Sequence, residues 1–72
     1  MPGLPLLSGQ DVCRALKRAG FSRKSQKGSH VKMAHQAGRI AIVPMHSEIA
    51  DGTLRSMLKQ AGLTAEELLA LL

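Results

Sequence analysis

The 72-residue sequence has few aromatic, cysteine and acidic residues. Phe21 is its one aromatic residue, so it lacks the stacking platforms that usually hold single-stranded bases. Cys13 is its one cysteine, which excludes an intrachain disulfide framework and favours a reducing, cytoplasmic compartment. The five acidic residues are scattered and do not form the paired carboxylates of a two-metal nuclease. With one cysteine and three separated histidines, a zinc site is not expected either, and we expect no cofactor.

Long apolar runs are also missing. No stretch approaches the roughly 18 consecutive apolar residues of a membrane span. The apolar opening, residues 1–7, lacks a charged leader and is interrupted by Pro2 and Pro5, which is untypical of a signal peptide. We expect one domain over residues 1–72 and no membrane partner. Residues 1–7 are expected to be a flexible N-terminal extension or a short packing strand.

Positive charge is concentrated in the N-terminal half. The net charge is +5, and residues 1–39 hold eight of the ten Lys and Arg residues against Asp11 alone. Residues 40–72 hold Arg55 and Lys59 against four acidic residues. A basic face of this kind is typical of nucleic-acid-binding proteins, although many small proteins carry positive charge for solubility alone.

Apolar spacing and capping signals predict three helices. The first spans residues 9–19, with a capping box formed by Ser8 and Asp11 and a left-handed stop at Gly20. Its apolar stripe at i, i+3, i+4 and i+7 consists of Val12, Ala15, Leu16 and Ala19. The second helix spans residues 52–61 and ends at Gly62. The third begins at Thr64, which can form a capping box with Glu67, and continues through Leu68, Leu69, Leu71 and Leu72.

Between the first two helices the pattern becomes that of strands. Residues 21–27 and 29–34 are strand candidates joined at Gly28, and residues 35–38 form a hairpin loop. Residues 39–43 are a third strand, which Pro44 closes because it lacks an N–H donor. Such short connections require antiparallel pairing of neighbours. We therefore predict an α+β fold of order α-β-β-β-α-α, with a three-stranded antiparallel sheet and the helices on one face.

Alternation along the strands predicts which side chains face solvent. We expect Val31, Met33, Ile40 and Ile42 to face the helices, and His30, Lys32 and Arg39 to face outward. Phe21 belongs to the core. An exposed imidazole among cations suits a phosphodiester, but alternation alone does not separate a catalytic histidine from a solvated one.

Cleavage of RNA requires removal of a proton from the 2′-hydroxyl and delivery of one to the leaving 5′-oxygen. Histidine suits both steps, because its ordinary pKa of about 6.5 lets it hold or release a proton near neutrality. Lysine and arginine stabilise the charge that develops on the phosphoryl oxygens. This route requires no metal ion.

Four motifs in order and spacing resemble the HicA toxin family. They are Gly20-Phe21, Lys27-Gly28-Ser29-His30, Val43-Pro44-Met45-His46 and the run from Gly52 to Gly62. The resemblance covers about residues 8–69. It implies a fold like the double-stranded-RNA-binding domain and an mRNA interferase that a HicB antitoxin neutralises.

The resemblance also assigns site residues. The family's catalytic histidine falls on His30, and its glycine falls on Gly28. His46 matches a recurring family position and is a secondary candidate with a structural or contact role, whereas His35 matches nothing and is interpreted as a loop residue. The expected RNA-binding residues are Lys24, Lys27, Gly28, Ser29, Lys32 and Arg39. Arg55 and Lys59 are weaker candidates for contact with phosphate or antitoxin.

The expected function is that of a type II toxin, a metal-independent endoribonuclease that cleaves mRNA with a catalytic histidine and is inhibited by a HicB-type antitoxin. Two alternatives stay open. One is a binding module that holds double-stranded RNA without cutting it, since a fold does not fix a function. The other is a DNA-binding accessory protein, which only the basic N-terminal half supports.

Overall fold

A computed structural model describes residues 4–72 of the protein. Its elements follow the predicted α-β-β-β-α-α order, and the predicted boundaries differ from the observed ones by at most one residue. They are α1 (Gly9–Arg18), β1 (Phe21–Lys27), β2 (His30–His35), β3 (Ile40–Pro44), α2 (Asp51–Ala61) and α3 (Ala65–Leu71). Of the expected extension over residues 1–7, residues 1–3 lie outside the described part of the chain.

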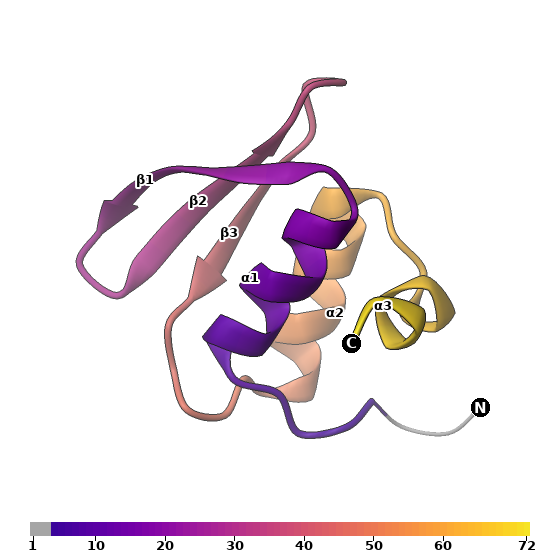
Figure 1. The fold of residues 1–72 in the computed structure, drawn as a ribbon. Helices are drawn as coiled ribbons and strands as arrows, with labels where there is room; N and C mark the ends of the chain where they lie inside the picture. The colour runs from indigo at the N-terminus through magenta and orange to yellow at the C-terminus, as the bar shows by residue number, and fades with distance from the viewer. Residues whose placement is uncertain (1–3) are drawn as a thin grey trace.

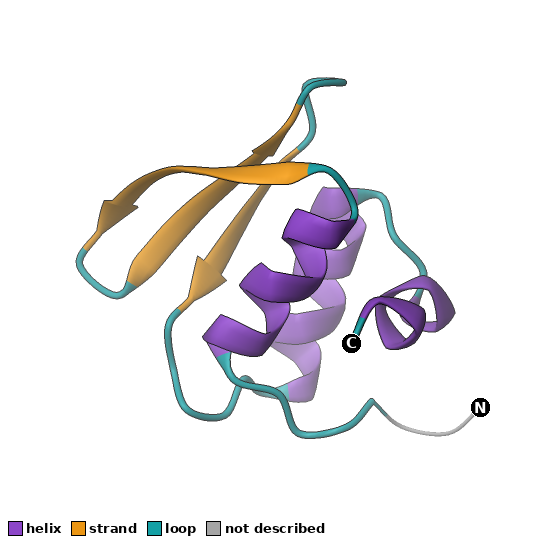
Figure 2. Ribbon diagram, in the orientation of Figure 1, coloured by secondary structure: helices purple, strands orange, loops and turns teal. Residues whose placement is uncertain are grey.

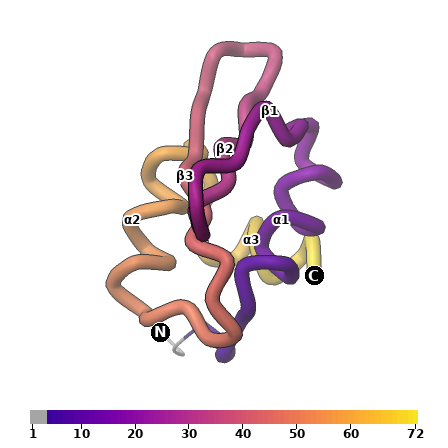
Figure 3. Tube along the Cα trace, turned by 90° about the vertical axis from the view of Figure 1, so that its left-hand side faces the viewer, coloured from indigo at the N-terminus to yellow at the C-terminus, as the bar shows by residue number. Residues whose placement is uncertain are grey.

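The fold has two layers, a three-stranded sheet and a helical layer on one of its faces (Figures 1 and 2). The strands are antiparallel and ordered β1-β2-β3, as the short connections predict. α1 packs on β1 and β3, α2 packs on β3, and α3 contacts both longer helices. The turn between β2 and β3 projects beyond the helices (Figures 1 and 3). Because all three helices lie on one face of the sheet, its other face has no covering layer from the described residues (Figures 1 and 2).

The helix ends carry the predicted capping groups. The backbone N–H of Ser8 donates to Oδ2 of Asp11 at 3.0 Å, and the Asp11 N–H donates to Oγ of Ser8 at 3.1 Å. Thr64 and Glu67 form the equivalent box before α3. Gly62 ends α2 at a φ of +71°, a left-handed conformation that favours glycine. These caps fix where α1 and α3 begin and where α2 ends.

The core lies between the sheet and the helices. Val31, Met33, Ala41 and Val43 are each 0% exposed, and Phe21 is buried as predicted. The helices contribute the predicted stripes, of which Ala15, Leu16, Leu54 and Leu68 are buried almost completely. Burial of these apolar side chains is the main term that stabilises a chain of this size. Within residues 4–72, no helix has the length and apolar character needed to cross a bilayer.

The prediction of which β3 side chains face the helices is wrong, because the inward-facing positions are shifted by one residue. Ala41 and Val43 face the helices, whereas Ile40 and Ile42 are 43% and 40% exposed on the other face. Every residue from Ile40 to Val43 is apolar, so alternation in the sequence does not fix which set points inward. Pairing with β2 fixes it instead, because Val31 lies opposite Val43 and Met33 opposite Ala41.

The segment after β3 is fastened to the start of α1. The N–H of Gly9 donates to the carbonyl of His46 at 2.9 Å, and the N–H of Ile49 donates to the carbonyl of Leu7 at 2.8 Å. A Cβ at position 9 would clash with the carbonyl oxygen of Pro44 and lie 2.7 Å from Cα of Met45. Only glycine therefore allows the two backbones to approach this closely.

Candidate nucleic-acid interface

The uncovered face of the sheet, here called the outer face, carries His30. Directly opposed residues of antiparallel strands share a face. In this register Lys27 of β1 and Pro44 of β3 flank His30, and both His30 and Lys27 are exposed. The next residue, Val31, is fully buried toward the helices, so the His30 side chain points to the outer face. The predicted exposure of this histidine is confirmed.

Lys32 lies one row further along the outer face. It is exposed and is flanked by Ser25 of β1 and Ile42 of β3. Ala34 and Ile40 oppose one another in the row beyond it. Ile40 and Ile42 therefore form an exposed pair, here called the apolar strip, beside the lysines. Alternation along the strand did not predict this strip, because it placed both isoleucines in the core.

The charged side chains of the three strands are all basic. Its strands contain Arg23, Lys24, Lys27 and Lys32, and all five acidic residues of the chain lie outside them. The ion pairs found among residues 4–72 join Arg14 to Asp11 and Arg55 to Asp51, both on helices. The strand lysines are thus unneutralised and exposed, which favours an anionic ligand.

A tight turn of two residues, Gly28 and Ser29, precedes His30. Gly28 has a φ of +58°, and Ser29 is not among the positive-φ residues, which is the pattern of a type II′ hairpin turn. Gln26 supports the turn by donating from Nε2 to the Gly28 carbonyl at 3.0 Å. A Cβ at Gly28 would have no neighbour within 4 Å, so the need for glycine here is conformational. Backbone geometry thus sets the start of β2 at His30.

Two of the predicted RNA-binding residues, Lys24 and Arg39, lie outside the paired rows of the sheet that contain His30 and Lys32. Lys24 is exposed at a β-bulge, since Arg23 pairs with Met33 and Ser25 pairs with Lys32. Arg39 lies beside the β2–β3 turn, at the opposite end of β2 from His30. Its guanidinium lies against Gly62, where an added Cβ would be 2.9 Å from Nε. The structure brings Lys27, Ser29 and Lys32 near His30. The expectation that Arg39 faces outward with them is wrong, because the one-residue shift of β3 turns Arg39 to the helix side, against Gly62.

His46 lies at the same end of the sheet as His30. The N–H of Met45 donates to the carbonyl of Ser29 at 2.6 Å, so residues adjacent to the two histidines are bonded directly. The His46 side chain is exposed and lines a hollow of about 230 Å³ with Ser8, Gln10, Met45 and Ser47. His46 thus lies close to the turn before His30 along the backbone, with its side chain in a hollow beside the start of α1.

His35 has a structural role, and its interpretation as a loop residue is wrong. It is the last residue of β2, and its ring packs edge-on against Phe21 at a centroid distance of 5.2 Å. Its Nδ1 accepts the N–H of Ala37 at 2.9 Å, which closes the β2–β3 turn. Among residues 4–72, no three His, Cys, Asp or Glu side chains gather closely enough to ligate one metal ion.

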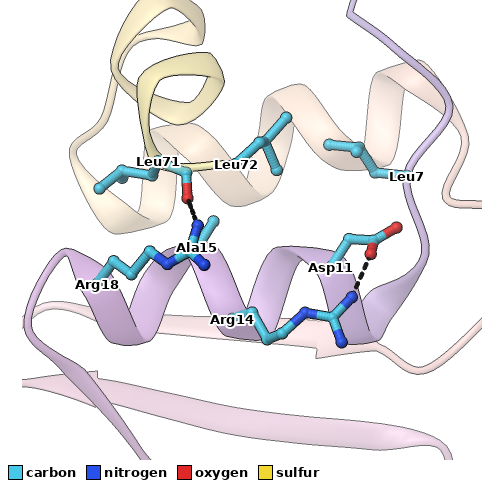
Figure 4. A pocket seen from close by; sticks show the side chains of 7 residues that line it. All are labelled: Leu7, Asp11, Arg14, Ala15, Arg18, Leu71 and Leu72. Carbon is cyan, nitrogen blue, oxygen red and sulfur yellow. Dashed lines mark hydrogen bonds and ion pairs between the residues drawn. The ribbon is translucent and has the colours of Figure 1, made fainter.

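A hollow of about 260 Å³ lies between α1 and the C-terminal end of α3, in the helical layer (Figure 4). Its lining residues are Leu7, Asp11, Arg14, Ala15, Arg18, Leu71 and Leu72. Arg18 donates from Nη1 to the Leu71 carbonyl at 2.6 Å, and Arg14 pairs with Asp11 at 2.6 Å. Both guanidinium groups thus bond partners within the chain, and Arg18 fastens α3 to α1.

These features define a small basic α+β domain that presents a histidine and several lysines on an open sheet face, a surface suited to a phosphate backbone. A family model described as the HicA toxin of bacterial toxin–antitoxin systems matches residues 9–63, which include all three strands and His30. The chain belongs to the HicA toxin family. It is accordingly the toxin of a toxin–antitoxin pair, and the family implies a cognate antitoxin as partner. A search of curated proteins gives no match.

Proposed function

We propose that the protein is a type II toxin that cleaves mRNA as a metal-independent endoribonuclease, with His30 as general acid and base. The observation that carries this proposal is the exposed His30 between Lys27 and Lys32 on a sheet without carboxylates. Histidine transfers protons near neutrality, and unpaired lysines attract the substrate phosphate. The protein would act in the cytoplasm, where a lone thiol such as Cys13 stays reduced.

The proposed reaction is an attack by the ribose on its own phosphate. His30 takes the proton of the 2′-hydroxyl, the 2′-oxygen bonds to phosphorus, and the bond from phosphorus to the 5′-oxygen breaks. The leaving 5′-oxygen then takes a proton from the protonated His30 or from water. The products are a 2′,3′-cyclic phosphate and a 5′-hydroxyl. Lys27 and Lys32 stabilise the negative charge on the phosphoryl oxygens as the transition state forms.

Substrate positioning would come from the residues around the hairpin turn. Lys24, Lys27 and Lys32 contact the RNA backbone, and the open turn at Gly28 and Ser29 lets a phosphate approach the main chain. Because no aromatic platform accompanies them, binding rests on charge and backbone shape. Selectivity for base sequence is therefore expected to be loose.

A HicB-type antitoxin would silence the toxin by covering the outer face. Acidic side chains of the antitoxin would pair with Lys27 and Lys32, and an apolar segment would cover Ile40 and Ile42. The apolar strip supports this proposal, because exposed β-branched side chains beside a charged site suit a protein partner better than RNA.

The proposal is tested with purified toxin and three matched oligonucleotides: RNA, RNA with a single 2′-deoxy residue at the cleaved position, and DNA. We expect the RNA to be cut to fragments ending in 2′,3′-cyclic phosphate, and the other two to resist cleavage at that position. Cleavage of the 2′-deoxy oligonucleotide would exclude attack by the 2′-hydroxyl. If a duplex of the same RNA is bound and neither the duplex nor the single strand is cut, the non-catalytic binding module is favoured instead.

A further inference from the structure

The bulge in β1 distributes its basic residues over two faces of the sheet. In a regular strand, residues 23, 25 and 27 would share one face. Because Lys24 is the extra residue, Arg23 instead shares the helix-side face with its partner Met33, while Lys27 shares the outer face with His30. Bulges commonly redirect side chains in this way. Basic groups thus occur on both sides of the free edge of β1.

On the helix side, Arg23 meets the exposed side of α1. Arg23, Arg14 and Lys17 line a hollow of about 200 Å³, which shares Gln10 and Met45 with the hollow beside His46. We call the two hollows together the α1 groove. The lining residues of the groove are Ser8, Gln10, Cys13, Arg14, Lys17, Arg23, Met45, His46 and Ser47.

The α1 groove is basic, and no large exposed hydrophobic residue lines it. None of its lining residues is acidic, and neither Lys17 nor Arg23 forms an ion pair with a carboxylate of residues 4–72. Arg14 lies at its rim and is paired with Asp11. The large exposed hydrophobic residues of the described chain, Leu6, Ile40, Ile42, Leu69 and Leu72, all lie elsewhere. Charge without apolar anchors suits a phosphate backbone better than a protein.

The groove adjoins the proposed cleavage site. Met45, in its middle, is bonded through its N–H to the carbonyl of Ser29, the residue before His30. Exposed Lys24 lies at the bulge of β1, next to Arg23 of the groove, and exposed Lys27 lies further along β1 on the outer face. A chain of positive groups therefore leads from Lys32 past His30, around the hairpin and into the groove.

We propose that the α1 groove binds the single-stranded RNA that flanks the cleaved phosphate, with Lys17 and Arg23 each contacting one phosphate. This proposal rests on the proposed ribonuclease function, because it takes RNA at His30 as its starting point. In this arrangement the substrate strand wraps around the edge of β1. RNA substrates too short to reach the α1 groove would therefore contact only the outer face.

The test measures RNA affinity by fluorescence anisotropy over a range of salt concentrations, with a single strand of about 12 nucleotides whose 2′-hydroxyls are methylated so that it is not cut. The variants are Lys17→Gln and Arg23→Gln, with Arg18→Gln as control, an exposed residue of α1 that lines the hollow beside α3 and not the groove. Each phosphate contact contributes about 0.7 to the slope of log affinity against log salt for a single strand. We expect each groove variant to lower the slope by about this amount and the control to leave it unchanged.

A second measurement separates a flanking contact from a catalytic one. The same variants cleave an RNA of about four nucleotides, for which we expect wild-type kcat/KM. An unchanged slope in both groove variants would overturn the proposal and leave the groove to another partner, such as an acidic protein surface. Equal losses on short and long RNA would also overturn it. If the wild type cuts no RNA but the salt slope is still lower in both groove variants, the proposed ribonuclease function is wrong and RNA binding by the α1 groove is supported.

Discussion

Met45 donates its N–H to the carbonyl of Ser29 at 2.6 Å, and this bond joins the loop after β3 to the turn before His30. Met45 also approaches Cys13, with 3.9 Å between the two sulfur atoms, so the loop is held against α1. Gly9 completes the attachment through its bond to the His46 carbonyl. The positions of His30, His46 and the α1 groove thus depend on the same few backbone contacts.

Gly9→Ala tests this attachment, with Gly52→Ala as the matched control. An alanine Cβ at position 9 clashes with the backbone of Pro44 and Met45, whereas one at position 52 has no neighbour within 4 Å. We expect Gly9→Ala to cost about 1–3 kcal/mol, as overpacking does, and Gly52→Ala to stabilise α2 by up to about 1 kcal/mol. Thermal unfolding measures both, and equal shifts in Tm would contradict the close approach at Gly9.

Ile42→Lys tests the role of the apolar strip. Ile42 is 40% exposed on the outer face, so its replacement removes little core packing. We expect antitoxin affinity to fall by about tenfold or more, because a buried unpaired lysine opposes docking, while RNA cleavage persists. Ser56→Lys on the exposed side of α2 is the control. Equal antitoxin affinity of the two variants, measured by calorimetry, would remove the strip from the interface.

Asp11 makes the stability of α1 depend on pH in the acidic range. Hydrogen bonds from the Ser8 backbone and side chain, together with Arg14, hold the pKa of Asp11 below its ordinary value of 3.8. A lowered folded-state pKa contributes stability above the ordinary value, and this stability is lost as the pH falls through the folded value. We expect Asp11→Asn to lower Tm at pH 7 and to match the wild type in strong acid. A constant difference in Tm at all pH values would contradict the capping role.

Cys13 is expected to react slowly with alkylating reagents. Burial raises the pKa of its thiol, although Arg23 and Lys17 oppose this effect, and the residue is 7% exposed. The thiolate, which is the reactive form, is therefore scarce at neutral pH. Labelling by iodoacetamide at pH 7 should be slower in the native protein than in the unfolded chain. Equal rates would show that Cys13 is accessible.

Much of the fold is predictable because its signals are local. The capping boxes at Ser8 and Thr64 and the left-handed Gly62 lie within a few residues of the helix ends that they fix. The apolar stripes place the helices, and the hairpin glycine at position 28 places β2. Exposure of His30 follows from the alternation in β2, where apolar Val31 and Met33 alternate with His30 and Lys32.

Other features depend on pairing partners that a single sequence does not reveal. The apolar run from Ile40 to Val43 fits either face, so only its pairing with β2 puts the isoleucines outside. The polar run of β1 gives no signal for the bulge at Lys24, and the helix-side position of Arg23 was therefore missed. His35 was interpreted as a loop residue because the contact that defines its role, with Phe21, joins two separate strands and leaves no local signal in the sequence.

The central claim is tested most directly by the single-turnover cleavage rate of His30→Ala on one defined RNA, compared with the wild type. Loss of a general acid–base group lowers rates by about 10²–10⁴-fold, and His30 is exposed, so the fold should survive the change. We predict a loss of this size with an unchanged Tm and retained RNA binding. Cleavage by His30→Ala at the wild-type rate would contradict the account.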